Sequence, residues 1–173
     1  MKQKLVVLFL AVAVLLAGSI GELRKRWAAP LLIPEGGFRL VVEKGDSLRK
    51  AAERLHKAGV LEFPQLLALY GRWTGLDQTI KRGEYLLPPD STAESLLMLL
   101  HRGAVIQYQV TLPEGITLGQ AIDTLAQQDQ LQSTLTGPND TNILEMIQPE
   151  SHPEGLFFPD TYRYARGDTD LSV

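Results

Sequence analysis

The residues best suited to chemistry lie near the end of the sequence, at positions 151–164. This stretch of 14 residues holds two prolines, one glycine, four aromatic side chains and two carboxylates, Glu154 and Asp160. Its prolines and glycine predict a loop, and loops that expose aromatic and acidic side chains together are unusual unless they line a site. Aromatic faces stack on pyranose rings, and a carboxylic acid can protonate a glycosidic oxygen. The composition therefore favours chemistry on a sugar.

Glu154 is the candidate acid. The neighbouring Phe157 and Phe158 predict an apolar setting, which raises the pKa of a carboxyl group. Asp160 and Thr161 are candidates for orienting this acid or for binding sugar hydroxyls.

On the residues alone, a structural alternative stays open. The two phenylalanines and Tyr162 can also form a core that clamps an irregular loop, with Glu154 as a surface charge. We expect no metal and no cofactor, because the three histidines are scattered, no HExxH or HxH pair occurs, and the chain has no cysteine.

Two similar segments each predict a strand–turn–helix corner, and both precede the stretch at 151–164. Residues 40–55 read LVVEKGDSLRKAAERL, residues 110–125 read VTLPEGITLGQAIDTL, and the two superpose at an offset of 70. Each predicts a strand, a turn with glycine, an N-cap (Ser47 or Thr117) and an amphipathic helix. Internal duplication and convergence on one strand–turn–helix pattern both stay open.

The remaining patterns complete a prediction of the α+β class. Pro64 marks the first turn of a second helix, and Ser91 and Glu94 have the spacing of a capping box. The further predicted elements are a helix at 64–74, a strand within 81–87, a helix at 93–101, a strand at 105–112 and a short helix at 142–147. Residues 38–88 are thus predicted to form a strand, two helices and a strand.

The first 27 residues and the rest of the sequence differ in the sign of their net charge. Residues 1–27 contain five of the 17 Lys and Arg residues and one of the 20 Asp and Glu residues, so the rest of the chain is acidic. An acidic body excludes nucleic acid as a partner, because such binding depends on neutralising phosphates with Lys and Arg.

Residues 5–21 form an uncharged, apolar run. Lysines precede it, and residues 24–27, Arg-Lys-Arg-Trp, follow it closely, so it predicts a single transmembrane helix within an anchor at 1–27. A cleaved signal peptide is the alternative. The flanking basic residues are nearly balanced and do not set the orientation. Residues 28–37, AAPLLIPEGG, predict a linker.

Residues 38–103 resemble a LysM module. Residues 42–48, VEKGDSL, are close to the opening motif of that family, and residues 80–86, IKRGEYL, resemble its closing motif. The resemblance implies affinity for chains that contain N-acetylglucosamine, such as peptidoglycan. A subdomain that has kept the fold without binding sugar is the alternative.

Residues 154–162, EGLFFPDTY, closely resemble the signature of the endolytic murein transglycosylases, the YceG-like or MltG family. The apolar anchor, the LysM-like subdomain and the corner at 110–117 occur in the order typical of that family. The resemblance implies that residues 104–173 begin a mixed α/β catalytic domain. Family members continue well beyond the signature, so we expect the sequence to be the N-terminal portion of a longer protein.

The resemblance implies a non-hydrolytic reaction with Glu154 as the catalytic residue. Glu154 would protonate the oxygen that links N-acetylmuramic acid to N-acetylglucosamine and then take the proton of the muramyl C6 hydroxyl. A 1,6-anhydro ring closes, and neither a metal nor a second carboxylate is required. The residues expected to bind substrate or support the site are Phe157, Phe158, Asp160, Thr161 and Tyr162.

The same resemblance implies a place in the cell. The protein would be a single-pass protein of the bacterial inner membrane, with a cytoplasmic N-terminus and its body on the outer side. It would cut nascent peptidoglycan strands there, limit their length and work with peptidoglycan synthases. Two alternatives stay open: a non-catalytic LysM-type tether that binds peptidoglycan, and a structural or interaction protein of the envelope.

Overall fold

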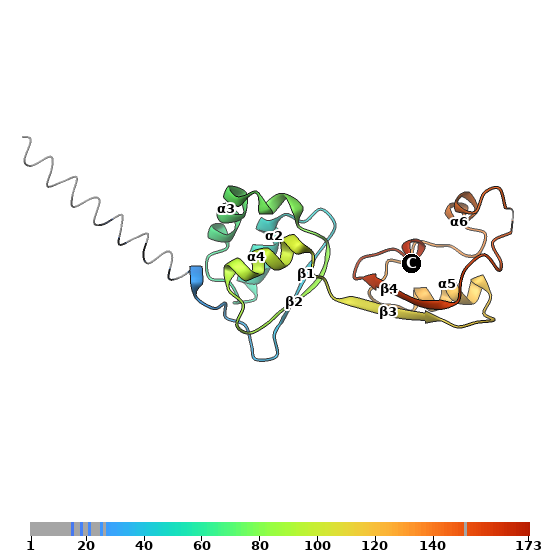
Figure 1. Ribbon diagram of the computed structural model, residues 1–173, viewed down its shortest axis with the longest axis horizontal. Coiled ribbons are helices and arrows are strands. Elements are labelled where there is room, and N and C mark those ends of the chain that lie inside the picture. Colours follow the sequence, from blue (N-terminus) through green and yellow to red (C-terminus); the bar gives the residue numbers. More distant parts are fainter. Residues whose placement is uncertain (1–14, 16–17, 19–20, 22–24, 26, 151) are drawn as a thin grey trace, which may run out of the picture.

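The computed structural model describes residues 15, 18, 21, 25, 27–150 and 152–173, and it has a mixed α+β fold (Figure 1). Two units lie side by side along the long axis: residues 38–103, the N-terminal unit, and residues 104–173, the C-terminal unit. Most of the predicted membrane span at 5–21 lies outside the described residues. Within the described part of the chain, no helix has the length and apolar character needed to cross a membrane.

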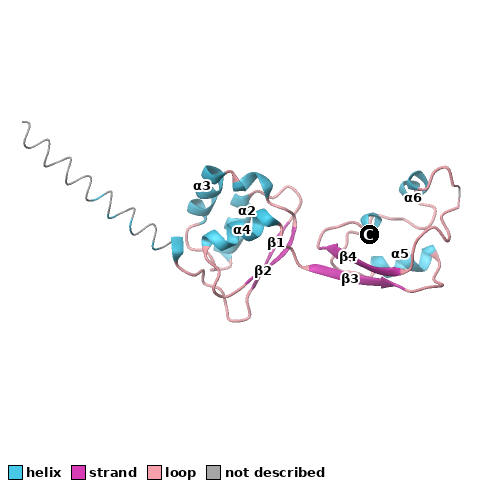
Figure 2. Cartoon of the chain, in the orientation of Figure 1, coloured by secondary structure: helices cyan, strands magenta, loops and turns pink. Residues whose placement is uncertain are grey.

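The N-terminal unit has the predicted order of strand, helix, helix and strand, followed by a third helix. The two strands pair antiparallel, and the helices pack against them around a core that includes the fully buried Leu55, Leu67 and Tyr85 (Figure 2). The elements are β1 (Phe38–Val42), α2 (Leu48–Lys57), α3 (Pro64–Thr74), the 3-10 helix η1 (Leu76–Thr79), β2 (Gly83–Leu87) and α4 (Ala93–Arg102).

Local chemistry explains where these helices begin. Ser47 caps α2 by accepting a hydrogen bond from the Lys50 backbone N–H, as predicted. The predicted cap of α4 was wrong by one residue. Thr92 and Ser95 form the capping box, because Ser91 is buried and belongs to the preceding turn.

The C-terminal unit is built on a second antiparallel pair of strands. Tyr164 is buried between this sheet and the helix that follows its first strand. The pairing runs from Leu112 opposite Asp160 to Gln107 opposite Ala165. The elements are β3 (Gln107–Leu112), α5 (Leu118–Ala126), α6 (Thr141–Met146), β4 (Asp160–Ala165) and the 3-10 helix η2 (Asp170–Ser172).

The sequence prediction of a loop throughout 151–164 was therefore wrong for its last part. Residues 160–164 lie in β4, where their backbone groups bond to β3. The side chains of Tyr162 and Tyr164 alternate onto the face that packs on the core of the C-terminal unit, with Tyr164 buried and Tyr162 half-buried. The alternation is the period-two pattern of a strand, hidden by the prolines and glycine before it.

Side-chain hydrogen bonds and ion pairs join the two units. The buried Glu84 of β2 accepts hydrogen bonds from the Tyr108 hydroxyl at 2.7 Å and from Arg166 Nε at 2.6 Å. A second ion pair links Arg82 to Asp168 at 2.8 Å. Each unit thus contributes charged side chains to the joint, which fixes how the units meet.

The predicted linker at 28–37 is partly packed onto the N-terminal unit. The backbone N–H of Leu31 donates to the Ser91 carbonyl at 2.8 Å, and that of Leu32 donates to the Val60 carbonyl at 3.0 Å. Leu31 also packs against the core of this unit. This stretch is therefore held close to the body over part of its length.

Candidate functional site

A tight turn presents Glu154. The Leu156 backbone N–H donates to the Pro153 carbonyl at 3.3 Å, which closes a turn with Glu154 and Gly155 at its two central positions. Gly155 has φ +81°, a left-handed conformation that residues with a side chain rarely adopt. The glycine after the acid is thus required by the backbone, and the buried Pro153 fixes the start of the turn.

The Glu154 carboxylate lies at the N-terminus of α5. Its two oxygens accept the Leu118 backbone N–H, at 3.1 Å and 3.2 Å. Leu118 is the first residue of α5, where backbone N–H groups have no partner within the helix and a carboxylate is favourably placed. The carboxylate is therefore held in one orientation although the residue is exposed.

The corner predicted at 110–117 positions this N–H group. Thr117 accepts the Gln120 backbone N–H at 3.2 Å, and the Gln120 side chain accepts the Thr117 N–H at 3.0 Å. This reciprocal pair is a capping box, which fixes where α5 begins. The geometry therefore connects the corner to Glu154, a link that neither motif reveals by itself.

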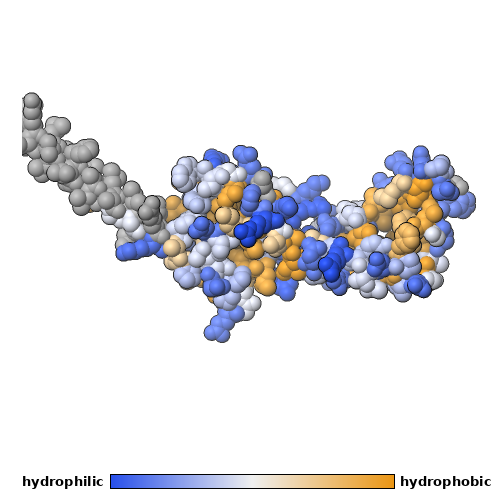
Figure 3. Space-filling model, in the orientation of Figure 1, coloured by the Kyte–Doolittle hydropathy of each residue, from blue (hydrophilic) through white to orange (hydrophobic). Residues whose placement is uncertain are grey.

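A shallow hollow of about 80 Å³ lies beside Glu154, between the β3–α5 corner and residues 154–159. Phe157 and Phe158 line it, with 43% and 81% of their surface exposed, so neither belongs to a core. Apolar surface gathers over this end of the C-terminal unit (Figure 3). The hollow is smaller than the few hundred Å³ typical of a small-molecule site. The described residues therefore form one side of an open surface site, and Glu154 lies on that side.

The other predicted site residues brace the segment around Glu154. Asp160 Oδ1 accepts the Thr161 backbone N–H at 2.6 Å, and the Thr161 hydroxyl meets the Thr111 hydroxyl at 2.9 Å across the sheet. The Tyr162 hydroxyl donates to the Phe158 carbonyl at 2.6 Å. The Tyr162 contact ties β4 to the loop that carries the phenylalanines, and the threonine contact ties β4 to β3. Substrate-binding roles for these residues remain predictions.

The Leu118 N–H group was missed by sequence reasoning as a part of this site. A backbone donor has no signature of its own, and Leu118 is 36 residues from Glu154. The available signal was the corner motif at 110–117, whose threonine marks the start of a helix.

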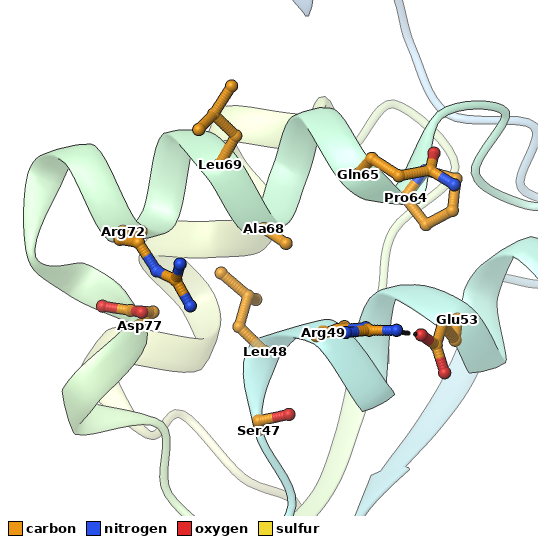
Figure 4. A pocket seen from close by; sticks show the side chains of 10 residues that line it. All are labelled: Ser47, Leu48, Arg49, Glu53, Pro64, Gln65, Ala68, Leu69, Arg72 and Asp77. Atoms are coloured by element: carbon orange, nitrogen blue, oxygen red, sulfur yellow. Dashed lines mark hydrogen bonds and ion pairs between the residues drawn. The ribbon is translucent and has the colours of Figure 1, made fainter.

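A second, larger hollow lies in the N-terminal unit, between α2 and α3 (Figure 4). It has a volume of about 460 Å³. Leu48 and Ala68 face each other across its apolar floor, and Arg49 at its edge pairs with Glu53 at 2.9 Å. Its size suits a small ligand. It lies far from Glu154, in the subdomain that resembles LysM.

Comparison with known proteins identifies the family of this chain. The model of the YceG-like family matches residues 40–173, and the chain belongs to this family, also called the MltG family. Among solved structures, it is similar to a YceG-like protein from Listeria monocytogenes. The two are 19% identical, with a TM-score of 0.40, and the match covers 79% of this chain and 50% of that chain. This chain thus spans half the length of that protein. The comparison with curated proteins gave no match.

Proposed function

We propose that this chain carries the acid of a membrane-anchored endolytic peptidoglycan transglycosylase. The enzyme cleaves the bond between N-acetylmuramic acid and N-acetylglucosamine within nascent glycan strands, leaves 1,6-anhydromuramyl ends and limits strand length. Membership of the YceG-like family supports this proposal. The observation that carries it is the Glu154 carboxylate, oriented by the Leu118 N–H beside two exposed phenylalanines.

In the proposed reaction, one carboxyl group acts twice. Protonated Glu154 gives its proton to the glycosidic oxygen as the bond from that oxygen to the muramyl C1 breaks. The resulting carboxylate then accepts the proton of the muramyl C6 hydroxyl while O6 bonds to C1. No water is consumed, and Glu154 ends protonated. Because the nucleophile belongs to the substrate, a second carboxylate of the kind used by hydrolases is not needed.

The surroundings of Glu154 suit these steps. The Leu118 N–H restricts the carboxylate to one direction, so a bound glycan strand would meet the same carboxyl group at both steps. The exposed rings of Phe157 and Phe158 offer apolar faces to pyranose rings. The Thr161 hydroxyl joins β4 to β3 through Thr111, and Asp160 accepts the adjacent Thr161 backbone N–H.

The proposal includes a location. Residues 1–27 anchor the protein in the bacterial inner membrane, with the span at about 5–21 and the N-terminus in the cytoplasm. The rest of the chain lies outside, where nascent strands and peptidoglycan synthases are. The apolar run supports the span, and the orientation follows from the proposed substrate, which lies on the outer side of the membrane.

The test uses the protein with all residues that its gene encodes, mixed with uncrosslinked peptidoglycan strands. Mass spectrometry should detect 1,6-anhydromuramyl ends, and Glu154→Gln should lower their rate of formation at least about a hundredfold, the range typical of a lost general acid. Glu150→Gln is the matched control, because it neutralises another exposed glutamate of the same segment.

Other products would overturn the proposal. Reducing muramyl ends would identify a hydrolase. Anhydro ends that persist unchanged in Glu154→Gln would remove this residue from the chemistry.

The hollow between α2 and α3 favours a second candidate function, a non-catalytic peptidoglycan tether. A tether would bind strands with the same affinity before and after Glu154→Gln and would release no anhydro products. Sedimentation with insoluble peptidoglycan measures the binding, and strand cleavage by the native protein would refute the tether.

A further inference from the structure

Three aromatic side chains continue from the N-terminal segment into α3. The Trp27 and Tyr70 ring centroids are 4.4 Å apart, and those of Tyr70 and Trp73 are 6.2 Å apart. We call these three residues the aromatic ladder. Trp27 and Tyr70 are half-buried, whereas Trp73 exposes 82% of its surface. The ladder therefore starts at the base of the predicted anchor and ends in a large indole that the described residues leave uncovered.

Further apolar surface surrounds the ladder. Leu69 lies four residues before Trp73, on the same face of α3, and is 65% exposed. On the other side of Trp27, a cavity of about 250 Å³ is lined mainly by apolar side chains. Leu32, which is 73% exposed, is among them. Single exposed leucines are common on protein surfaces, but here Leu69 adjoins the exposed Trp73 and Leu32 shares a cavity with Trp27.

The sequence next to the ladder indicates what covers this surface. The apolar run ends at Gly21, six residues before Trp27, and at the helical rise of 1.5 Å per residue this separation would correspond to about 9 Å. The described residues Gly21, Lys25 and Trp27 are helical. The polar layer on each side of a bilayer core is about 5–8 Å thick, so a run that crosses the core places Trp27 in or at the edge of this layer.

Tyr70 contacts Trp27 and Trp73 contacts Tyr70, so α3 cannot lie far from the same layer. Figure 1 shows α3 and the start of the described chain at one end of the N-terminal unit. Tryptophan and tyrosine are enriched at membrane interfaces because their rings are apolar and their N–H and O–H groups are polar.

We infer that α3 lies against the bilayer surface, with Trp73 and Leu69 in the headgroup layer of the membrane that holds the anchor. The partner is thus a phospholipid surface. The N-terminal unit then has one membrane-facing side, and its orientation above the bilayer is fixed. This inference rests on the membrane anchor in the proposed function.

The sequence has two tryptophans, so Trp27→Phe leaves Trp73 as the single fluorescent indole. The chain of residues 1–173 is placed in vesicles of phosphatidylethanolamine and phosphatidylglycerol that contain acyl chains brominated either near the headgroup or near the tail end. Shallow bromines should quench Trp73 at least about twofold more than deep ones, and its emission should be blue-shifted, because interfacial indoles lie at headgroup depth. Trp73→Phe gives the complementary signal from Trp27, which should also be quenched by shallow bromines.

A matched control places an indole at equal exposure on the other unit. Phe158 is 81% exposed, and Phe158→Trp in a chain with both native tryptophans replaced by phenylalanine should show no quenching by lipid. Quenching equal to that of Trp73 would overturn the inference. So would water-like emission from Trp73 that neither bromine position changes.

Flotation of the vesicles distinguishes failure of the proposed membrane anchor from failure of the contact between α3 and the bilayer. Protein that fails to float with the vesicles would refute the membrane anchor and this inference together. Protein that floats while Trp73 stays unquenched would refute the contact of α3 alone. Thermal melts of the two single-tryptophan variants should match that of the native protein, which shows that loss of the signal does not come from misfolding.

Discussion

The Glu84 carboxylate is buried and yet ionised. Only 3% of the residue is exposed, and burial by itself opposes the negative charge. Hydrogen bonds from Tyr108, Arg166 and Arg39 outweigh this effect and lower the pKa of Glu84 to about 2. Each of the three donors therefore helps to keep this buried carboxylate charged.

The low pKa of Glu84 predicts acid sensitivity. The carboxyl has a pKa near 4.5 in an unfolded chain and about 2 in the folded protein. Its contribution to the free energy of unfolding is therefore complete above about pH 4.5 and is lost as the pH falls toward 2. The loss amounts to at most about 3 kcal/mol. Urea unfolding at a series of pH values measures it.

Glu84→Gln is the control for this measurement. Asp140, whose pKa is also lowered to about 2 by hydrogen bonds from Thr136 and Asn142, titrates in the same range in both proteins. The difference between native protein and variant thus isolates Glu84. It should shrink as the pH falls, and a constant difference would contradict the assignment.

Glu154 and Glu84 show what a sequence reveals about single residues. Glu154 stands in a signature of nine contiguous positions, so the local sequence is enough to make it a candidate. Glu84 stands in a short strand, and its partner Arg166 is 82 residues away. No local pattern encodes that pairing, because it forms only when the two units meet.

At the scale of the elements, the proposed chemistry depends most on α5, because the Leu118 backbone N–H at its N-terminus orients Glu154. Both strand–turn–helix corners have the same geometry: Gly45 and Gly115 have φ values of +83° and +82°, and Ser47 and Thr117 are the N-caps. These corners were predicted correctly because turn and cap residues act within a few positions of each other. In the second corner, the helix start also holds an acid.

Removing the cap of α5 should therefore affect both stability and cleavage. Thr117→Ala should lower the free energy of unfolding by about 1 kcal/mol. It should also lower the rate of anhydro-end formation about tenfold, because a frayed first turn no longer holds the Leu118 N–H against Glu154. Chemical unfolding and the strand-cleavage assay measure the two effects.

Thr92→Ala is the matched control, because Thr92 caps α4 with the same reciprocal geometry in the other unit. It should cost a similar free energy of unfolding and leave the cleavage rate unchanged. Equal loss of activity in both variants would mean that the effect comes from stability alone.

Strand β4 was not predicted because its evidence is not local. Its residues pair with β3, about 50 positions earlier, and the preceding prolines favoured a loop. The cap of α4 was misplaced for a similar reason. The Ser91 carbonyl accepts the Leu31 backbone N–H of the packed segment at 30–33. A local pattern of cap residues cannot predict a contact with a residue so distant in the sequence.

At the scale of the whole chain, no sequence pattern predicted the joint between the two units, because its partners are far apart in the sequence. Arg166 and Arg39 both pair with Glu84, but only Arg166 belongs to the C-terminal unit. Interfaces between units that rest on a few polar contacts allow relative motion by default. The joint should therefore depend on Arg166 and not on Arg39.

Spin labels test this directly, since the chain has no native cysteine. Lys57→Cys and Gln127→Cys place one label on the exposed surface of each unit. Arg166→Gln should broaden the distribution of distances between the labels about twofold, as expected for units released from a fixed joint. Arg39→Gln, which removes an ion pair within one unit, should leave the width unchanged, and equal broadening would refute the bridging role.

The packed segment at residues 31–32 has a mechanical consequence. A freely jointed tether would absorb tension by straightening before any load reached the body. Here the backbone is fastened to Ser91, just before α4, and to Val60, just after α2. In the proposed enzyme, tension on a glycan strand bound at the C-terminal unit would pass through the Glu84 joint and these two attachments to the proposed membrane anchor, with little lengthening of the chain between them. The two units would then move together with the proposed anchor.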